Sequence, residues 1–348
     1  MNNSIKIYKN LVSPFNQSKV LLHKDKFDEL KQNIIASPVC CEIDLADGFC
    51  NNKCKHCFFG TNNSNKRIFI DKYRLKEILY ELRNIGVKAI EFSGGGEPLT
   101  HPYATEIIKF TSAIGFDIGL VTNGLLLDKV FDIADKFKFI RISLDSATRA
   151  MYYETHGVDC FDRVVDNIAK LCDKKCGDII GIGYLITGIN NSDIIDAALL
   201  AKNLGVRFIQ YRPASLPYKI DEMIWIEAQK LVDEAIDFSD EEFQVFGAGI
   251  KWTHLNKNRY YSRCYTNSLV SVIKANGDIP MCVLKRNDDK SILGNMYNNT
   301  FKEIFFSKKH YDLIEKNDVF MCRKPCKHDS YNIMYEAYIT DLLHMNFI

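Results

Sequence analysis

Three cysteines lie in one short segment, Cys50-Asn51-Asn52-Lys53-Cys54-Lys55-His56-Cys57. Thiolates that converge on one point need a positive partner, either a metal ion or an iron–sulfur cluster. A structural zinc ion needs a fourth ligand nearby, and His56 is an awkward one because Cys57 directly follows it. Three thiolates without a local fourth ligand favour a four-iron cluster with one open iron. A disulfide or a chance group of cysteines is the alternative.

The sequence on either side of the cysteines predicts a ligand site at the ends of strands. A predicted strand at 39–45 leads directly into them, and the run Gly94-Gly95-Gly96-Glu97-Pro98 follows a second predicted strand. Parallel α/β folds bind ligands at the carboxyl ends of their strands. Three consecutive glycines let the backbone approach a ligand closely. Without the cysteines, the run would be interpreted as an ordinary strand-to-helix turn.

Strands and helices alternate through the first two thirds of the chain, which predicts a parallel α/β sheet. The predicted strands span 39–45, 87–93, 117–122, 139–144, 179–187 and 206–211. Six such units are too few for a closed eight-stranded barrel, so we expect a partial, six-stranded (β/α) barrel of the TIM type.

The pattern changes in the last third of the chain, which predicts a small α+β domain. Residues 268–283 are expected to form a hairpin that turns at Asn276-Gly277, followed by helices at 301–315 and 331–343. The predicted organisation is an N-terminal extension at 1–37, a core domain at 38–245, and a C-terminal domain at 246–348.

A second set of cysteines lies in this C-terminal part: Cys264, Cys282, Cys322 and Cys326. Four thiolates from separated segments can close a complete shell around an iron–sulfur cluster. Zinc also takes four cysteines, so a zinc site is the alternative, as is a purely structural cluster.

The CxxxCxxC spacing followed by the glycine run resembles the radical SAM superfamily over about residues 38–215, and a second part of the resemblance reaches 264–326. It implies that Cys50, Cys54 and Cys57 bind a [4Fe–4S] cluster whose open iron chelates the amino and carboxylate groups of S-adenosylmethionine (SAM). An external electron donor such as flavodoxin or ferredoxin would reduce this cluster. SAM would then be cleaved to methionine and a 5′-deoxyadenosyl radical that abstracts a hydrogen atom.

The same resemblance implies which residues contact SAM. The backbone of His56 stands where the family has an aromatic residue against adenine, and the glycine run would receive the methionine amino group. Polar groups at other strand ends would contact the ribose or the carboxylate. The implied SAM-binding residues are His56, Gly94, Gly95, Gly96, Glu97, Asn123, Ser143, Asp145 and Arg212. The alternatives are that Asp145 or Ser146 caps the next helix and that Arg212 is an ordinary surface arginine.

The second cysteine set resembles the short twitch form of an auxiliary-cluster domain. The longer SPASM form holds two auxiliary clusters and needs more cysteines than follow Cys326. We therefore expect one auxiliary [4Fe–4S] cluster with four protein ligands. Because no iron is then open for substrate, electron transfer is its expected role.

Composition restricts the class of protein. The formal net charge of +1 gives no reason to expect a nucleic-acid or membrane surface. The first residues lack a signal-peptide core, and no uncharged apolar run is long enough to span a bilayer. A cytoplasmic, reducing location follows, in which clustered cysteines bind metals more often than they form disulfides.

Together these features predict a radical SAM oxidoreductase. It would dehydrogenate a small biosynthetic intermediate and pass the second electron to the auxiliary cluster. A first alternative is a maturase or epimerase of a ribosomal peptide, although the residues before 38 are too few for a leader-binding domain. A second alternative is a non-catalytic zinc or iron–sulfur protein.

Overall fold

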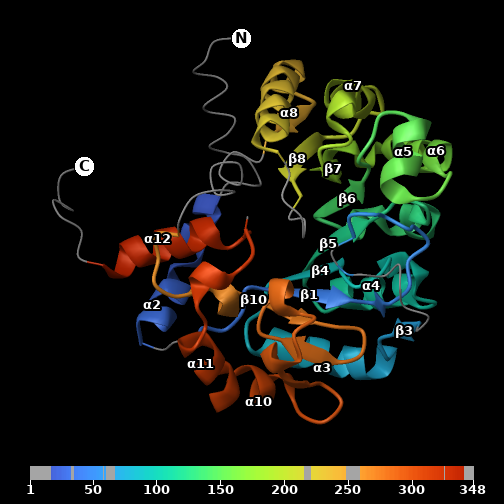
Figure 1. Ribbon diagram of the computed structural model, residues 1–348. Helices are drawn as coiled ribbons and strands as arrows, with labels where there is room; N and C mark the ends of the chain where they lie inside the picture. Colours follow the sequence, from blue (N-terminus) through green and yellow to red (C-terminus); the bar gives the residue numbers. More distant parts are fainter. Residues whose placement is uncertain are drawn as a thin grey trace.

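The computed structural model (Figure 1) describes residues 17–32, 35–57, 59, 67–214, 221–247, 259–324 and 326–340, with backbone only at 175 and 176. Its centre is a sheet of eight parallel strands in the order β10-β1-β4-β5-β6-β7-β8-β9. Figure 1 shows these strands following one another from β10 and β1 up to β8. The α/β prediction is confirmed.

All six predicted strands are present. They are β1 (Cys40–Asp44), β4 (Ala89–Ser93), β5 (Asp117–Thr122), β6 (Phe139–Ser143), β7 (Ile180–Ile186) and β8 (Phe208–Pro213). Two strands that the sequence analysis did not assign to this sheet extend it, β9 (Gln244–Phe246) beside β8 and β10 (Val270–Ile273) beside β1. Two short strands, β2 (Ala46–Asp47) and β3 (Ile68–Phe69), pair with each other after β1.

One face of the sheet is apolar and packs against helices. Ile43, Phe92, Leu120, Ile142 and Ile182 alternate with the residues of the other face and are completely buried. Each such side chain contributes about 1.5–3 kcal/mol by its burial. The helices that follow the strands are α3 (Lys72–Asn84), α4 (Ala104–Ala113), the 3-10 helix η4 (Leu127–Lys136), α5 (Arg149–His156), α6 (Phe161–Leu171), α7 (Ile194–Asn203) and α8 (Glu222–Ala235).

The opposite face of the sheet carries charged and polar side chains. In the parallel register Glu42 is level with Glu91, and Ser143 is level with Gly183 and Gln210. Because paired residues of neighbouring strands point to the same side, the register places these side chains together. We call the following residues the polar face: Glu42, Asp44, Glu91, Arg141, Ser143, Gln210 and Arg212.

The C-terminal part contributes a strand to the central sheet, and the predicted hairpin is wrong in its pairing. The chain does turn at Asn276-Gly277, where Gly277 has φ 87° and its N–H donates to Lys274 O at 2.8 Å. However, β10 pairs with β1, whereas β11 (Asp278–Pro280) pairs with β12 (Ile292–Asn295) in a separate two-stranded sheet.

The remaining helices lie on the side of β10. The predicted helix at 301–315 is divided at Phe306-Ser307 into α10 (Phe301–Phe305) and α11 (Lys308–Glu315), because Ser307 caps a new helix. The N-terminal helix α2 (Lys24–Gln32) packs against α12 (Asp329–Ile339), with the rings of Phe27 and Tyr335 5.2 Å apart. Residues 341–343 of the last predicted helix lie outside the described residues. None of the described helices combines the length and the apolar character needed to cross a bilayer.

Candidate iron–sulfur and SAM site

The cysteines after β1 lie in a loop, residues 48–57, which we call the cysteine loop. Its three cysteines are half-buried and do not form disulfides. Burial raises the pKa of Cys54, and the neighbouring Asp145, Cys50 and Cys57 raise it further. Burial also raises the pKa of Cys50 to about 11. These sulfurs therefore share a region in which thiolates need a positive partner.

Helix α5 fastens the middle of the cysteine loop. The N–H of Lys53 donates to His156 O at 2.8 Å, and the N–H of Lys55 donates to Thr155 O at 3.3 Å. Gly157 ends the helix in the left-handed region with φ 68°, and a side chain there would collide with the backbone of Lys53. The end of α5 thus fixes the height of the loop above the sheet.

The glycine run packs against the base of the same loop. Gly94 has φ 107°, and a Cβ atom there would overlap the carboxylate of Asp44. A Cβ atom at Gly96 would overlap the carbonyl oxygen of Phe49, which also accepts a hydrogen bond from Glu97 N at 3.2 Å. The glycines therefore permit close contact with the cysteine loop itself, in addition to any contact with a ligand.

The carboxylate of Glu97 is buried and bound by protein donors. It accepts hydrogen bonds from Thr122 Oγ1 at 2.7 Å, Asn123 N at 2.8 Å and Leu99 N at 3.1 Å. Asn123 in turn donates from Nδ2 to Asn51 Oδ1 at 2.6 Å and lies 3.6 Å from Cys50 Sγ. Glu97 and Asn123 therefore connect the glycine run, the end of β5 and the cysteine loop, and their contact with SAM stays a proposal.

Asp145 connects the cysteine loop to β6 and β7. Its Oδ2 lies 3.0 Å from His56 Nε2 and 3.6 Å from His156 Nε2, while Oδ1 accepts from Leu185 N at 2.7 Å. Burial alone would raise the pKa of this carboxyl, but the hydrogen bond from His56, the two imidazoles and the Leu185 N–H outweigh it and hold the pKa below its ordinary value. Asp145 does not cap α5, whose N-cap is Thr148. Its predicted ribose contact stays a proposal.

His156 is a site residue that the sequence analysis missed. It is 1 % exposed, and its Nδ1 lies 3.2 Å from Cys54 Sγ. The amide of Asn52, also missed, lies 3.4 Å from the same nitrogen. Burial lowers the pKa of His156 to about 4, so the ring is neutral near pH 7. The only sequence signal was a histidine before a helix-ending glycine, in a helix that was not predicted.

Ser143 and Arg212 both lie on the polar face and are half-buried. Ser143 ends β6 opposite Gly183, and Arg212 stands in β8 opposite Leu185. Arg141, another residue that the sequence analysis did not select, lies two positions before Ser143 on the same face. The interpretation of Arg212 as an ordinary surface arginine does not fit, because burial lowers its pKa to about 9.

The four C-terminal cysteines influence one another. Burial raises the pKa of Cys282 to about 12, with Cys264 and Cys322 adding to the shift. Burial likewise raises the pKa of Cys326, and Cys282 and Cys264 raise it further. The structure therefore brings together thiols from segments that are far apart in sequence, as a shared cluster requires.

Two ion pairs join this second set to the polar face. Lys327, which follows Cys326, pairs with Glu42 of β1. Arg286 pairs with Asp44, and both side chains are almost completely buried. A Cβ atom at Gly95 would lie only 3.0 Å from the Nη2 atom of Arg286. The segments that follow Cys282 and Cys326 are thus in contact with the strand that carries the cysteine loop.

The hydrogen-bond donors around the thiols suit cluster ligands. Cys50, Cys282 and Cys326 each accept, at 3.4 Å, the N–H of the residue two positions later. Donors directed at cysteine sulfur stabilise thiolates bound to an iron–sulfur cluster. Within the described ranges no three His, Cys, Asp or Glu side chains are grouped to hold a single metal ion.

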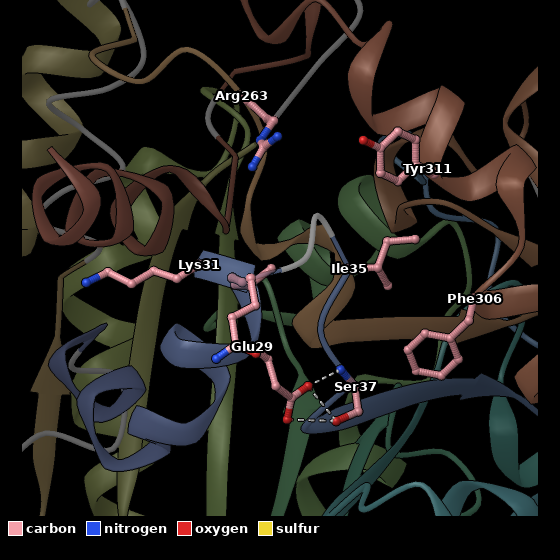
Figure 2. A pocket seen from close by; sticks show the side chains of 9 residues that line it. Glu29, Lys31, Ile35, Ser37, Arg263, Phe306 and Tyr311 are labelled. Atoms are coloured by element: carbon pink, nitrogen blue, oxygen red, sulfur yellow. Dashed lines mark hydrogen bonds between the residues drawn. The ribbon is translucent and has the colours of Figure 1, made fainter.

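A cavity of about 680 Å³ lies elsewhere, between α2 and the C-terminal helices (Figure 2). Its labelled lining residues include Lys31, Arg263 and Tyr311, and Glu29 accepts hydrogen bonds from Ser37 at its base. None of its lining residues belongs to the cysteine loop or to the polar face. It is therefore distinct from the site described above.

Comparison with protein families identifies the class. The radical SAM superfamily matches residues 48–201, and the SPASM iron–sulfur cluster-binding domain matches residues 264–328. Residues 48–201 are thus a radical SAM domain, and residues 264–328 are a C-terminal SPASM domain. The first domain binds a [4Fe–4S] cluster and SAM, and the second binds auxiliary iron–sulfur clusters. The four C-terminal cysteines lie inside the second match, which favours iron–sulfur over zinc there.

Curated relatives match only part of the chain. A probable GTP 3′,8-cyclase of Saccharolobus islandicus is 27% identical over 176 residues, covering 48% of this chain and 55% of that protein. The GTP 3′,8-cyclase of Chlorobaculum tepidum is 28% identical over 182 residues, covering 51% and 53%. The chain thus spans about half the length of the curated relatives it matches.

Solved structures match more of the fold. Streptococcus suis SuiB bound to S-adenosylmethionine aligns with a TM-score of 0.68 and 18% identity over 84% of this chain and 71% of that one. SuiB bound to precursor peptide SuiA aligns with a TM-score of 0.68 and 19% identity. This alignment covers 88% of this chain and 73% of that one. Native anSMEcpe with bound AdoMet aligns with a TM-score of 0.62 and 18% identity. This alignment covers 80% of this chain and 83% of that one. At these identities the likeness concerns the fold.

Proposed function

We propose that this protein cleaves SAM reductively and uses the resulting radical to abstract a hydrogen atom from a substrate on the polar face. The observation that carries the proposal is the meeting of the cysteine loop, the glycine run and the carboxyl ends of β5 and β6 at one edge of the sheet. When bound, the cluster supplies the electron that cleaves the carbon–sulfur bond of SAM. Cys50, Cys54 and Cys57 are its proposed ligands.

The protein's contribution is to hold that edge rigid. Asn123 and Glu97 fix the glycine run against the loop, while Asp145 holds the imidazole of His56 in place. Since these groups are buried and hydrogen-bonded, the loop is ordered before a ligand arrives, which reduces the cost of positioning SAM. Ser143, on the adjacent polar face, is a proposed contact for SAM.

We propose further that the net reaction is an oxidation in which the auxiliary cluster accepts the second electron. The contacts Lys327–Glu42 and Arg286–Asp44 support this, because they place the second cysteine set against the face on which the substrate would lie. A small flavodoxin or ferredoxin in the same compartment would supply the first electron. The proposed substrate is a small biosynthetic intermediate.

Peptide modification is the second candidate function. It is favoured by the fold comparison, since SuiB carries a bound precursor peptide and anSMEcpe was solved with peptides. These alignments cover four fifths or more of the chain, whereas the match to GTP 3′,8-cyclases leaves about half of it unmatched. The fold therefore supports a peptide substrate more than nucleotide cyclisation.

Formation of 5′-deoxyadenosine tests the proposed function. The protein is purified anaerobically, its clusters are reconstituted, and SAM and dithionite are added. We expect 5′-deoxyadenosine and methionine in equal amounts, and none from a variant with Cys50, Cys54 and Cys57 replaced by alanine. A protein with a fully loaded first cluster that leaves SAM intact would contradict the proposal. Deuterium transfer from candidate substrates into 5′-deoxyadenosine then separates small molecules from peptides.

A further inference from the structure

Two arginines of the polar face have no ion-pair partner among the described residues. The acidic side chains on or beside the face are Glu91 and three that are paired: Glu42 with Lys327, Asp44 with Arg286, and Asp145 with His56. Within the part of the chain that the structure describes, the Nε atoms of Arg141 and Arg212 are buried without a hydrogen-bond partner.

The two arginines lie side by side above a glycine. Arg141 is in β6 and Arg212 in β8, and the strand between them, β7, has Gly183 on this face. A Cβ atom at Gly183 would lie 3.0 Å from Arg212 Nη2 and 3.1 Å from Arg141 Cδ. A methyl group at 183 would therefore require the guanidinium group of Arg212 and the aliphatic part of Arg141 to move slightly. The glycine provides the space in which both cations approach each other.

The surroundings compensate the charge of Arg212 only in part. Burial lowers the pKa of Arg212, and the neighbouring Arg141 lowers it further, while Asp145 and Glu91 partly oppose this. The buried amide oxygen of Gln210, on the strand position level with Gly183, also lacks a partner among the described residues. Two neighbouring like charges with buried Nε atoms are costly unless an anion joins them.

We infer that Arg141 and Arg212 form the binding site for an acidic group of the substrate, a carboxylate or a phosphate. Paired guanidinium groups bind such oxyanions through two or more charge-assisted hydrogen bonds. The inference rests on the proposed function. It specifies that the substrate of that function is an anionic molecule. The phosphate of a small metabolite and the carboxylate of an acid or a peptide share this chemistry.

The position of Arg141 along β6 favours the substrate over the carboxylate of SAM, whereas Arg212, level with Leu185, lies nearer the edge. Arg141 lies two residues before Ser143, about 7 Å farther from the edge that carries the cysteine loop. In radical SAM enzymes the carboxylate of SAM is taken by the open iron at that edge. An acidic group held by the arginines would leave the rest of the substrate directed toward the loop.

Anion binding to the reconstituted protein tests the inference. Inorganic phosphate and acetate are titrated separately, and binding is measured by calorimetry and by the rise in Tm. We expect saturable binding of at least one anion, and the stronger one indicates which acid the substrate carries. Replacement Arg141→Gln or Arg212→Gln should weaken it about tenfold or more, because a charge-assisted bond is lost. Arg149→Gln, which removes an exposed arginine paired with Asp159, should leave it unchanged.

Two further measurements make the test sharp. Without anion, Arg212→Gln should have the same Tm as the wild type or a higher one, because an uncompensated buried charge is removed; a merely structural arginine would instead lower it. Gly183→Ala should weaken anion binding while both charges remain. Retained anion affinity in both glutamine variants, or no saturable binding by the wild type, overturns the inference.

SAM binding distinguishes the two possible occupants. The affinity for SAM is measured by the change that SAM causes in the EPR spectrum of the reduced cluster. We expect it to be equal in the wild type and in Arg212→Gln. A loss of SAM affinity parallel to the loss of phosphate or acetate affinity would assign the pair to SAM and overturn the inference. Anion titration does not require SAM cleavage, so failure of the proposed function is recognised separately.

Discussion

The imidazole Nδ1 of His156 lies 3.2 Å from the Sγ atom of Cys54. The backbone N–H of Asp145 donates to the other ring nitrogen, Nε2, at 3.4 Å. In the tautomer in which Nε2 accepts this bond, the ring proton is on Nδ1 and is directed at the sulfur. In that tautomer His156 donates a hydrogen bond to a proposed cluster ligand, from a helix that also fastens the loop.

Loss of this donor should make the first cluster harder to reduce. A hydrogen bond to a ligating sulfur stabilises the more negative, reduced state. If the bond contributes about 1 kcal/mol, His156→Phe should lower the reduction potential by up to about 40 mV. An EPR-monitored redox titration measures the shift. His156→Gln, which keeps a donor, should recover part of it, and His310→Phe, at a buried histidine bonded to Phe305 O, should leave the potential unchanged. A potential unaffected by His156→Phe would show that the contact has no electronic role.

Substitution by alanine should cost more stability at Gly94, in the glycine run, than at Gly86, a glycine with a similar positive φ. Gly94 and Gly86 have φ 107° and 96°, but only Gly94 faces a side chain, that of Asp44. Gly86→Ala should cost about 1–2 kcal/mol from backbone strain alone. Gly94→Ala should cost about 1–3 kcal/mol more, because Asp44 and its partner Arg286 must move. Urea unfolding of the cluster-free proteins measures the free energy of unfolding of both variants. Equal losses would mean that the side chain of Asp44 moves aside without cost.

The two cysteine sets should lose iron independently. If each holds a four-iron cluster, the wild type contains about eight irons per chain. Replacing Cys50, Cys54 and Cys57 with alanine should leave about four, and so should replacing Cys264, Cys282, Cys322 and Cys326. Iron analysis and Mössbauer spectra measure the content. Cys160→Ala, at a free thiol outside both sets, is the matched control. Loss of all iron from either variant would contradict two separate clusters.

Glu97 should prove to be a positioning residue rather than a simple SAM ligand. Glu97→Gln replaces one acceptor oxygen by an amide that faces the donors of Thr122 or Asn123. We expect a loss of about 1–3 kcal/mol in the free energy of unfolding, measured on cluster-free protein. SAM affinity should fall together with iron content, since the loop is loosened. A variant of unchanged stability with weakened SAM binding would instead show direct contact between SAM and the carboxylate.

The regular part of the sheet was predictable because each strand is a local pattern. The uncharged run at 179–187, for example, became β7 (Ile180–Ile186), in which six of the seven residues are buried. The pairing of β10 was not predictable. Its turn at Asn276-Gly277 forms as the local sequence indicates, but the choice of β1 as partner depends on a ladder between residues more than 200 positions apart.

The candidate site was predictable in location and less so in its contacts. The cysteine loop and the glycine run do meet, as their spacing suggested. The partners of Glu97 and Asp145 come from other strands, and no local pattern reveals that Leu185 or Thr122 will occupy their oxygens. Helix α5 is only eight residues long, so its periodicity was too weak to detect, and His156 was overlooked with it.

The pairing of β10 with β1 also bears on how such a protein can change over time. Val270 is level with Cys40 in a hydrogen-bonded ladder, so the tail that carries the second cysteine set is built into the frame that carries the first. A flexible tether would absorb insertions and deletions, whereas a ladder transmits each one as a shift in register. Exchange of tails between related enzymes would therefore have to replace an edge strand as well, and the distance between the two cysteine sets should be inherited as a fixed dimension.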